Sequence, residues 1–306
     1  MFAKLHAVAR QVSQIVVGKD LQIRQSLACL LAGGHLLIED VPGVGKTTLA
    51  HALAISLGLK FNRLQFTSDL LPADVIGVSI FNREKNGFVF HPGPVFTQML
   101  LADEINRATP KTQSALLEAM EERQVTADGI TRELPQPYFV IATQNPMHQI
   151  GTFQLPESQL DRFLMCLSLG YPDAAAERAL LMGEDRRMML KALSAAMQPE
   201  ELIAAQAALK DIHASSALID YVQALAQASR QSGLFAEGMS PRAGIALLQS
   251  ARAWAALEGR NHVIPEDVQA VLVPVAAHRL RPLKSGSSST LGSRDLVLQL
   301  MKSVPV

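Results

Sequence analysis

The chain has 306 residues, a length that favours two domains with a large core. Its 28 basic residues balance 28 acidic ones, so no overall charge attracts nucleic acid or anionic lipid. No apolar run approaches the ~20 residues that span a bilayer, and residues 1–6 lack the apolar core of a signal peptide. We therefore expect a cytoplasmic protein with no membrane span and no nucleic-acid partner. Cys29 and Cys166 lie in apolar runs and are expected to be buried free thiols.

Two helices are predicted before the first strand. Apolar residues at positions 5, 8, 12, 15 and 16 have the spacing of an amphipathic helix, and residues 21–32 form a second helical stretch. Val17 and Gly18 lie between them. In many nucleotide-binding ATPases a Val-Gly segment of this kind lines the adenine pocket, although by itself it indicates only a turn before a helix.

A phosphate-binding loop is predicted at residues 40–48. The apolar run 36–38 predicts a strand, and the pattern after residue 48 predicts a helix, which is the context that such a loop requires. Backbone N–H groups of the loop and of the helix N-terminus would bind the phosphates. Lys46 would reach the β- and γ-phosphates, and the Thr47 hydroxyl would bind Mg²⁺.

Asp40 occupies the first glycine position of the general pattern GxxxxGK[ST]. Asp tolerates the sharp turn expected there better than most residues. Its carboxylate must point away from bound phosphate or be neutralised, and nucleotide affinity could otherwise suffer.

The next segment, residues 61–96, contains a predicted strand and a predicted hairpin. Residues 61–66 alternate as in a strand. Residues 69–77 begin like a capped helix that Pro72 interrupts. Residues 78–90 predict a short hairpin with its turn at Asn86-Gly87.

Two carboxylates end the apolar run 99–102. Because open α/β sheets bind ligands at the carboxyl ends of their strands, Asp103 and Glu104 are expected near the phosphate loop. Asp103 would complete the Mg²⁺ shell, and Glu104 would orient and deprotonate the attacking water. One residue cannot easily do both, because a carboxylate on the metal is a poor base. Without the phosphate loop, the pair would indicate only a solvated strand end.

Residues 112–169 continue the α/β pattern. Residues 112–122 predict a helix, 124–134 a hairpin and 138–143 a buried strand, after which the Asn145 amide could contact the water or the γ-phosphate. Alternatively, Asn145 is only a turn residue before proline. Residues 155–163 predict a short helix carrying Arg162. From the local sequence alone, Arg162 could form a surface ion pair with Asp161 or Glu157. Residues 163–169 predict a strand.

From residue 173 the pattern is helical, with four or five helices expected and no strand through 280. Ser240 is a good N-cap and Pro241 suits the first helical position, which places Arg242 in a first turn. A cation opposes the helix dipole there, so a nearby bound anion would explain it; a surface carboxylate would do so equally. Residues 284–290 predict a flexible loop before a C-terminal helix at 294–302.

These landmarks resemble an AAA+ ATPase and, more narrowly, the MoxR family, over roughly residues 5–280. The resemblance rests on residues 40–48, 66–72, 93–96, 103–107, 142–146, 160–163 and 240–242. It implies an α/β fold, with an AAA+ P-loop parallel sheet flanked by helices and then an all-helical lid domain. The expected domains are residues 1–172 (nucleotide binding), 173–283 (lid) and 284–306 (flexible loop and C-terminal helix).

The resemblance also implies roles for individual residues. Asp103 and Glu104 match Walker B, Asn145 the first sensor, Arg162 the arginine finger and Arg242 the second sensor. Residues 69–90 match the helix-two insert of this clade, and 124–134 the hairpin before the first sensor. Walker A and the Val-Gly segment together give the expected nucleotide-binding residues: Val17, Gly18, Pro42, Gly43, Val44, Gly45, Lys46, Thr47 and Thr48.

The sequence thus predicts an ATPase that uses ATP and Mg²⁺. By resemblance it would form a homo-oligomer, usually a hexameric ring, and act with a von Willebrand A-domain protein or another client, maturing complexes or inserting metal. A nucleic-acid motor shares the same core, but neutral charge and the lack of a basic run argue against it. A slow nucleotide-dependent adaptor is disfavoured because the catalytic set is complete.

Overall fold

The central sheet of the computed structural model consists of parallel strands in the order β2-β5-β8-β1-β9. The structure describes residues 2–145, 152–183, 185–283 and 291–306, so the loop predicted at 284–290 lies outside the described residues. Parallel strands place their carboxyl ends at one edge. The strands are β1 (Leu36–Glu39), β2 (Phe61–Gln65), β5 (Met99–Asp103), β8 (Phe139–Gln144) and β9 (Met165–Leu167).

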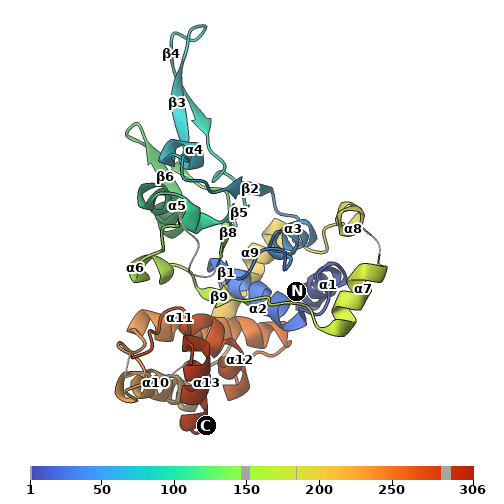
Figure 1. Ribbon diagram of the computed structural model, residues 1–306, viewed down its shortest axis with the longest axis vertical. Helices are drawn as coiled ribbons and strands as arrows, with labels where there is room; N and C mark the ends of the chain where they lie inside the picture. The colour runs from blue at the N-terminus through green and yellow to red at the C-terminus, as the bar shows by residue number, and fades with distance from the viewer. Residues whose placement is uncertain (1, 146–151, 184, 284–290) are drawn as a thin grey trace.

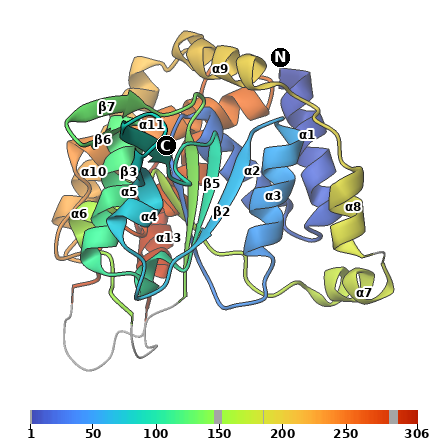
Figure 2. The ribbon, with the colours of Figure 1, turned by 90° about the horizontal axis from the view of Figure 1, so that it is seen from above.

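Helices cover both faces of this sheet, as Figure 2 shows from above. On one face lie α1 (Phe2–Ile15), α2 (Asp20–Leu31) and α3 (Lys46–Ser56), and on the other lies α5 (Pro110–Glu122). Side chains alternate between these faces along each strand: Leu36 and Ile38 join the core cluster on the α1–α3 face, and Leu37 joins the one around α5. Burial on both faces explains why the strands read as unbroken apolar runs.

Two hairpins rise from the α5 side (Figure 1). One is formed by β3 (Gly77–Asn82) and β4 (Gly87–Pro92), and the other by β6 (Gln124–Ala127) and β7 (Ile130–Glu133), so both predicted hairpins are confirmed. The turn of the first is residues 83–86, one step earlier than predicted, because Gly87 already pairs with Asn82. The prediction for Pro72 was wrong. Pro72 begins helix α4 (Pro72–Ile76) at the first helical position, where its missing N–H costs nothing, and the Asp74 carboxylate accepts a hydrogen bond from the Leu71 N–H at 2.8 Å.

The segment before β9 also differs from the prediction. Helix α6 (Glu157–Leu160) has four residues, and Arg162 lies in the turn beyond it, not in the helix. Strand β9 is shorter than the predicted strand at 163–169. The side chain of Arg279 reaches into this turn and bonds the Asp161 carboxylate at 2.7 Å and the Phe163 carbonyl at 2.7 Å. A nearly buried arginine of the helical region therefore holds the turn that carries Arg162.

The chain after β9 is helical, as predicted, but six α-helices lie within described residues 174–276, more than the four or five expected. Helix α11 packs on α2, and α12 on β9, so the helical region shares one hydrophobic cluster with the α1–α3 face (Figure 1). The boundaries at 172 and 283 stay predictions. The helices are α7 (Ala174–Met182), α8 (Arg186–Ala192), α9 (Pro199–Ala208), α10 (Ser216–Gln231), α11 (Pro241–Leu257) and α12 (Pro265–Ala276), followed by α13 (Ser293–Ser303); η1 (Ile105–Arg107) and η2 (Leu209–Asp211) are short 3₁₀ turns.

Two further expectations concern the cysteines and the membrane. Cys29 and Cys166 are both free and buried, which confirms the expectation from their apolar surroundings. Among the described residues, no helix combines the length and apolar character needed to cross a bilayer.

Candidate functional site

The loop between β1 and α3 has the backbone of a phosphate-binding loop. Gly43 and Gly45 have φ of +86° and +95°, in the left-handed region, and a Cβ added at either would meet no heavy atom within 4 Å. Their backbone therefore faces open space that a ligand can approach closely. Helix α3 begins at Lys46, directly after this loop, so its free N–H groups and the positive end of its dipole face the same space.

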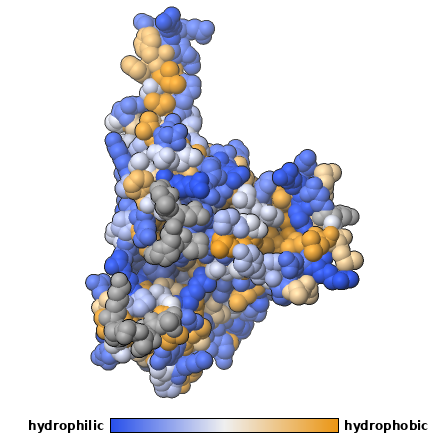
Figure 3. Space-filling model, in the orientation of Figure 1, coloured by the Kyte–Doolittle hydropathy of each residue, from blue (hydrophilic) through white to orange (hydrophobic). Residues whose placement is uncertain are grey.

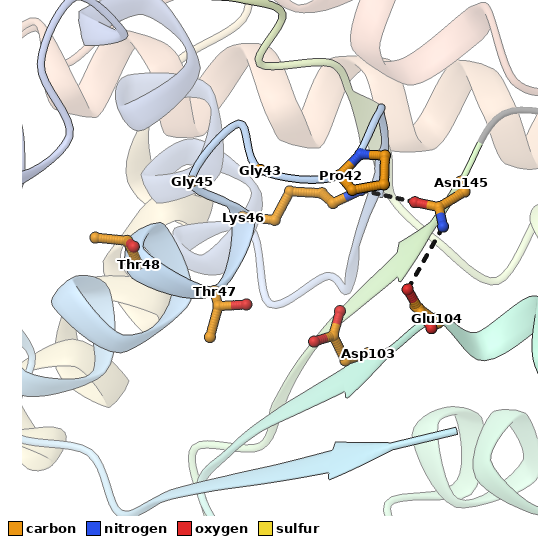
Figure 4. A pocket seen from close by; sticks show the side chains of 9 residues that line it. All are labelled: Pro42, Gly43, Gly45, Lys46, Thr47, Thr48, Asp103, Glu104 and Asn145. Carbon is orange, nitrogen blue, oxygen red and sulfur yellow. Dashed lines mark hydrogen bonds between the residues drawn. The ribbon is translucent and has the colours of Figure 1, made fainter. Parts of the chain in front are cut away.

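A cavity of about 310 Å³ opens at this loop, at the carboxyl edge of the sheet (Figure 4). It collects most of the predicted site residues from three separate parts of the chain. Val44 instead packs against the hydrophobic core. The lining residues are Pro42, Gly43, Gly45, Lys46, Thr47, Thr48, Asp103, Glu104 and Asn145.

The Lys46 side chain lines this cavity and extends toward Asn145. Its Nζ donates to the Asp40 carbonyl oxygen at 2.5 Å and to the Asn145 Oδ1 at 3.3 Å (Figure 4). Burial lowers the pKa of Lys46, although the carboxylates of Asp40, Asp103 and Glu104 act in the opposite direction. The lysine is thus held between two neutral oxygen acceptors, which an anionic ligand could replace.

A buried threonine on β8 bonds both Walker B residues, one through its carboxylate and the other through its backbone. The Thr143 hydroxyl donates to Asp103 Oδ1 at 2.6 Å and accepts from the Glu104 backbone N–H at 2.9 Å. The other oxygen of Asp103 accepts from the Arg63 Nη2 on β2 at 2.7 Å. Thr143 therefore holds the end of β5 against β8, and Arg63 neutralises Asp103.

Glu104 has an unusual backbone and a crowded carboxylate. Its φ of 55° places it in the left-handed region, which a non-glycine residue adopts at a cost and which is common at functional sites. The carboxylate contacts Gln65 Nε2 at 2.9 Å, Arg107 Nε at 3.0 Å and Asn145 Nδ2 at 3.5 Å. Three side chains from different elements thus hold this carboxylate beside the cavity, separate from the Asp103 contacts.

The residues present fit a Mg²⁺ ion accompanied by phosphates. The Thr47 hydroxyl and the Asp103 carboxylate face each other across the cavity (Figure 4). Mg²⁺ is commonly held by one or two protein oxygens, with waters and substrate phosphates completing the shell. Among the described residues, no group of three or more His, Cys, Asp or Glu side chains could hold a metal by itself.

Asp40 points away from this cavity. Its Oδ1 accepts from the Val41 N–H at 2.8 Å, and its Oδ2 accepts from Ser168 Oγ at 2.9 Å and the Gly170 N–H at 2.6 Å. The departure from the glycine pattern is therefore accommodated by turning the carboxylate toward the end of β9, one of the two solutions expected from the sequence.

Val17 and Gly18 do not line the cavity. They lie in the turn between α1 and α2, where Gly18 has a φ of +72° and a Cβ added to it would come within 2.7 Å of the Ala176 Cβ. The turn therefore packs closely against α7. Their predicted role in binding adenine stays a prediction.

Arg162 and Arg242 lie together, at the opposite end of β1. Arg162 Nη2 is 3.0 Å from one Glu121 oxygen, and Arg242 Nη2 is 3.4 Å from the other. Both arginines line a second cavity, of about 380 Å³, with residues 32–35, which precede β1. The phosphate loop follows β1, so these two side chains are at the amino edge of the sheet and the first cavity is at its carboxyl edge.

The ion pairs of Arg162 differ from those that the sequence suggested. Arg162 pairs with Glu121 and not with Asp161 or Glu157. Asp161 instead contacts Arg279 at 2.7 Å and Arg242 at 3.7 Å. Arg242 thus has the surface carboxylate partners of its plainer interpretation. Arg242 therefore lies with Arg162 and away from the phosphate loop.

Sequence reasoning missed Arg63, Gln65, Thr143 and Glu121 as parts of these clusters. Thr143 carried a signal, since it is a polar residue inside a buried strand. Gln65 and Arg63 lie on an exposed edge strand, where polar residues are ordinary. Glu121 could not be found, because its contacts depend on where the helical region places Arg242 and where the turn after α6 places Arg162.

Comparisons with known proteins agree with this geometry. Residues 35–165 match the family "ATPase family associated with various cellular activities (AAA)", and residues 227–296 match an AAA lid domain. The uncharacterized protein YeaC of Bacillus subtilis is 44% identical, over 99% of this chain and 94% of its own. Chaperone MoxR1 of Mycobacterium tuberculosis is 41% identical, over 91% of this chain and 76% of its own.

A third relative and a solved structure extend the comparison. Protein MoxR of Paracoccus denitrificans is 36% identical, over 91% of this chain and 88% of its own. The crystal structure of a candidate ATPase from Cytophaga hutchinsonii superposes with a TM-score of 0.89 at 34% identity, covering 99% of this chain and 95% of that one. The chain therefore belongs to the MoxR family of AAA+ ATPases.

Proposed function

We propose that this ATPase acts in the cytoplasm as a chaperone-like machine, in which Mg²⁺-dependent hydrolysis drives remodelling or maturation of a protein partner. The observation that carries the proposal is the convergence of Lys46, Thr47, Asp103, Glu104 and Asn145 on one cavity. Phosphoryl transfer to water needs positioning and charge stabilisation more than covalent chemistry, and these residue types supply both.

Each residue has a role that its contacts support. The glycine-bearing loop and Lys46 would bind the phosphates. Thr47 and Asp103 would hold Mg²⁺, which supplies charge neutralisation when bound. Glu104, which is held apart from Asp103 by Gln65 and Arg107, would accept a proton from the attacking water. Asn145 lies within reach of both Lys46 and Glu104 and would orient that water.

The position of the two arginines supports an oligomer. Arg162 and Arg242 are at the edge of the sheet opposite the phosphate loop, so neither is placed to serve the nucleotide of its own subunit. We infer that both enter the site of a neighbouring copy, which requires a head-to-tail assembly such as a hexameric ring. For Arg242 this replaces a sensor role in its own subunit with one in the neighbour.

The β3–β4 hairpin is the proposed contact with the partner. Exposed apolar side chains follow it outward from the body, including Ile80 (52% exposed), Phe81 (50%) and Phe88 (75%), and Figure 3 shows apolar surface along this projection. None of them lines the nucleotide cavity. Exposed apolar side chains in a row are typical of protein contact sites. A client protein, or a von Willebrand A-domain partner as in related systems, would bind here, and the client would be matured, for example by metal insertion.

Two assays test the proposal. Steady-state phosphate release, with Lys46→Ala as the inactive reference, separates an ATPase motor from a slow adaptor. Glu104→Gln, saturated with ATP, should then retain partner proteins from an extract that Lys46→Ala does not retain. If both variants retained the same proteins, partner binding would be independent of ATP and the remodelling proposal would fail. Salt-sensitive retention of nucleic acid in place of protein would favour the motor alternative.

A further inference from the structure

The Asp40 carboxylate is bonded to residues 168–170, which follow β9, and it binds neither phosphate nor Mg²⁺ in the proposed chemistry. Strand β1 pairs with β9 only as far as Ile38 opposite Leu167. Strand β1 continues to Glu39 and the Asp40 N–H still donates to the Gln144 carbonyl on β8 at 3.2 Å, but the β1–β9 register ends before residues 168–170. The Asp40 carboxylate accepts from Ser168 Oγ and from the Gly170 N–H, and so bonds polar groups that follow the last backbone pair of β1 with β9.

These bonds favour the charged carboxylate. Burial alone would raise the pKa of Asp40, but donors from Gly170, Ser168 and the loop backbone outweigh it, and the pKa lies below its ordinary value. Charge-assisted hydrogen bonds are about twice as strong as neutral ones. A glycine at position 40 would provide none of these acceptors.

The segment that Asp40 holds, residues 168–173, is the β9–α7 connector. It contacts the α1–α2 turn directly: Lys19 Nζ donates to the Tyr171 carbonyl oxygen at 2.8 Å. Helix α7, which follows the connector, packs on the same turn through Ala176 and Gly18. The connector thus links the base of the phosphate loop at Asp40 with the turn containing Val17 and Gly18.

We propose that Asp40 is a positioning residue that sets the nucleoside side of the ATP site by fixing the β9–α7 connector against the phosphate loop. The inference rests on the proposed ATP site and on the prediction that Val17 and Gly18 lie beside the adenine of the bound nucleotide. It predicts that the carboxylate matters for ligands that carry a nucleoside and not for bare triphosphate, which needs only the loop and Lys46.

The test compares Asp40→Ala with the wild-type protein for three ligands in the presence of Mg²⁺: ATP, ADP and inorganic tripolyphosphate. Affinity for ATP and ADP should fall about ten-fold, as expected for losing one charge-assisted contact. Affinity for tripolyphosphate should be unchanged. Asp220→Ala removes an exposed carboxylate from α10 and controls for the change in net charge.

Ser168→Ala is a second variant, which keeps the Asp40 charge and removes one of its donors. It should also reduce nucleotide affinity, by a smaller factor. If thermal unfolding shows that Asp40→Ala is not folded, Ser168→Ala replaces it in the comparison of the three ligands. Equal losses for tripolyphosphate and ATP would overturn the inference, because the effect would then lie in the loop. Tighter tripolyphosphate binding would also overturn it, since it would show that Asp40 repels phosphate.

Failure of this inference can be separated from failure of the proposed function. If the wild-type protein bound neither ATP nor ADP, the proposed ATP site would be wrong. If the wild-type protein bound both and the Asp40 and Ser168 variants bound them equally well, only the role of Asp40 would be refuted.

Discussion

Replacing Arg162 with alanine separates a catalytic role from a structural one, because the two predict effects of very different size. In one subunit Arg162 makes an ion pair with Glu121 at 3.0 Å and donates to the Leu117 carbonyl at 2.8 Å, with its side chain 31% exposed. Contacts of this kind at a surface contribute about 1 kcal/mol to stability. A finger that enters a neighbour's site contributes roughly 10³ to 10⁵ in rate.

We therefore expect Arg162→Ala to fold, to bind ATP and to lose nearly all phosphate release. Thermal unfolding, ATP binding and phosphate release measure the three quantities. Arg281→Ala is the matched control, since Arg281 is also an exposed arginine paired with a carboxylate, that of Glu157. The control should show a similarly small change in stability and normal turnover.

Mixing two inactive variants tests whether the finger acts between subunits. In an equal mixture of Arg162→Ala and Lys46→Ala, about one quarter of head-to-tail interfaces combine an intact loop with an intact finger. Activity should rise toward that fraction of the wild-type rate. A mixture that stayed inactive although labelled subunits had exchanged would refute a shared site.

The same approach locates Arg242. If Arg242 and Arg162 both serve the neighbour, as their common partner Glu121 indicates, a mixture of Arg162→Ala with Arg242→Ala stays inactive, because every interface lacks one arginine. If Arg242 served its own subunit, about one quarter of the interfaces in this mixture would be complete and activity would return. Recovered activity would therefore contradict the inferred position of Arg242.

Three further predictions address the general base, the hairpin and the core. Glu104→Gln should keep ATP binding while lowering turnover by about 10² to 10⁴, as expected for a lost general base, whereas Lys46→Ala should weaken binding itself; normal phosphate release by Glu104→Gln would refute its role. Phe88→Ser removes an exposed apolar side chain of the β3–β4 hairpin, so basal ATPase activity should persist while stimulation by a partner falls; an unaltered partner response would refute the proposed contact. Burial lowers the pKa of His35 from 6.5 to about 4, and its Nδ1 accepts from the Val140 N–H. Between these two pH values the unfolded chain binds a proton that the folded protein does not. The free energy of unfolding should therefore fall by about 3 kcal/mol as the pH drops from 6.5 to 4. Denaturant titrations of His35→Gln should show a flatter profile over that range, and an unchanged slope would contradict the assignment.

Much of the nucleotide cavity could be predicted because its parts are local and its assembly follows from sheet topology. The loop at 40–48 is a continuous pattern, and Asp103 and Asn145 each follow an apolar strand. Parallel strands bring such ends together at one edge, whatever their separation in sequence. The strand order places β8 between β5 and β1, which is why Asn145 contacts both Lys46 and Glu104.

The arginine cluster could not be predicted from local patterns. Arg162, Glu121 and Arg242 come from a turn, from α5 and from α11, and they meet only because α12 and Arg279 place the helical region against the start of β9. Helix capping explained the start of α11 at Ser240 and Pro241, but it could not show which carboxylate Arg242 faces. Contacts that depend on packing between distant elements leave no periodic signal in the sequence.

The placement of the two clusters also constrains the assembly. One subunit presents a phosphate loop at the carboxyl edge of its sheet and a pair of arginines at the amino edge, so the proposed complete site needs two different surfaces in contact. A contact of that kind is heterologous, and repeating it gives either a closed ring or an open filament. A hexamer therefore requires a rotation of about 60° between neighbours, with every subunit both donor and acceptor of the same two arginines. Because each arginine is held by Glu121 in the single subunit, docking on a neighbour's triphosphate would exchange a carboxylate partner for a phosphate one. Assembly and nucleotide binding would then both compete with these ion pairs, and in the proposed ring hydrolysis would depend on a correctly placed neighbour.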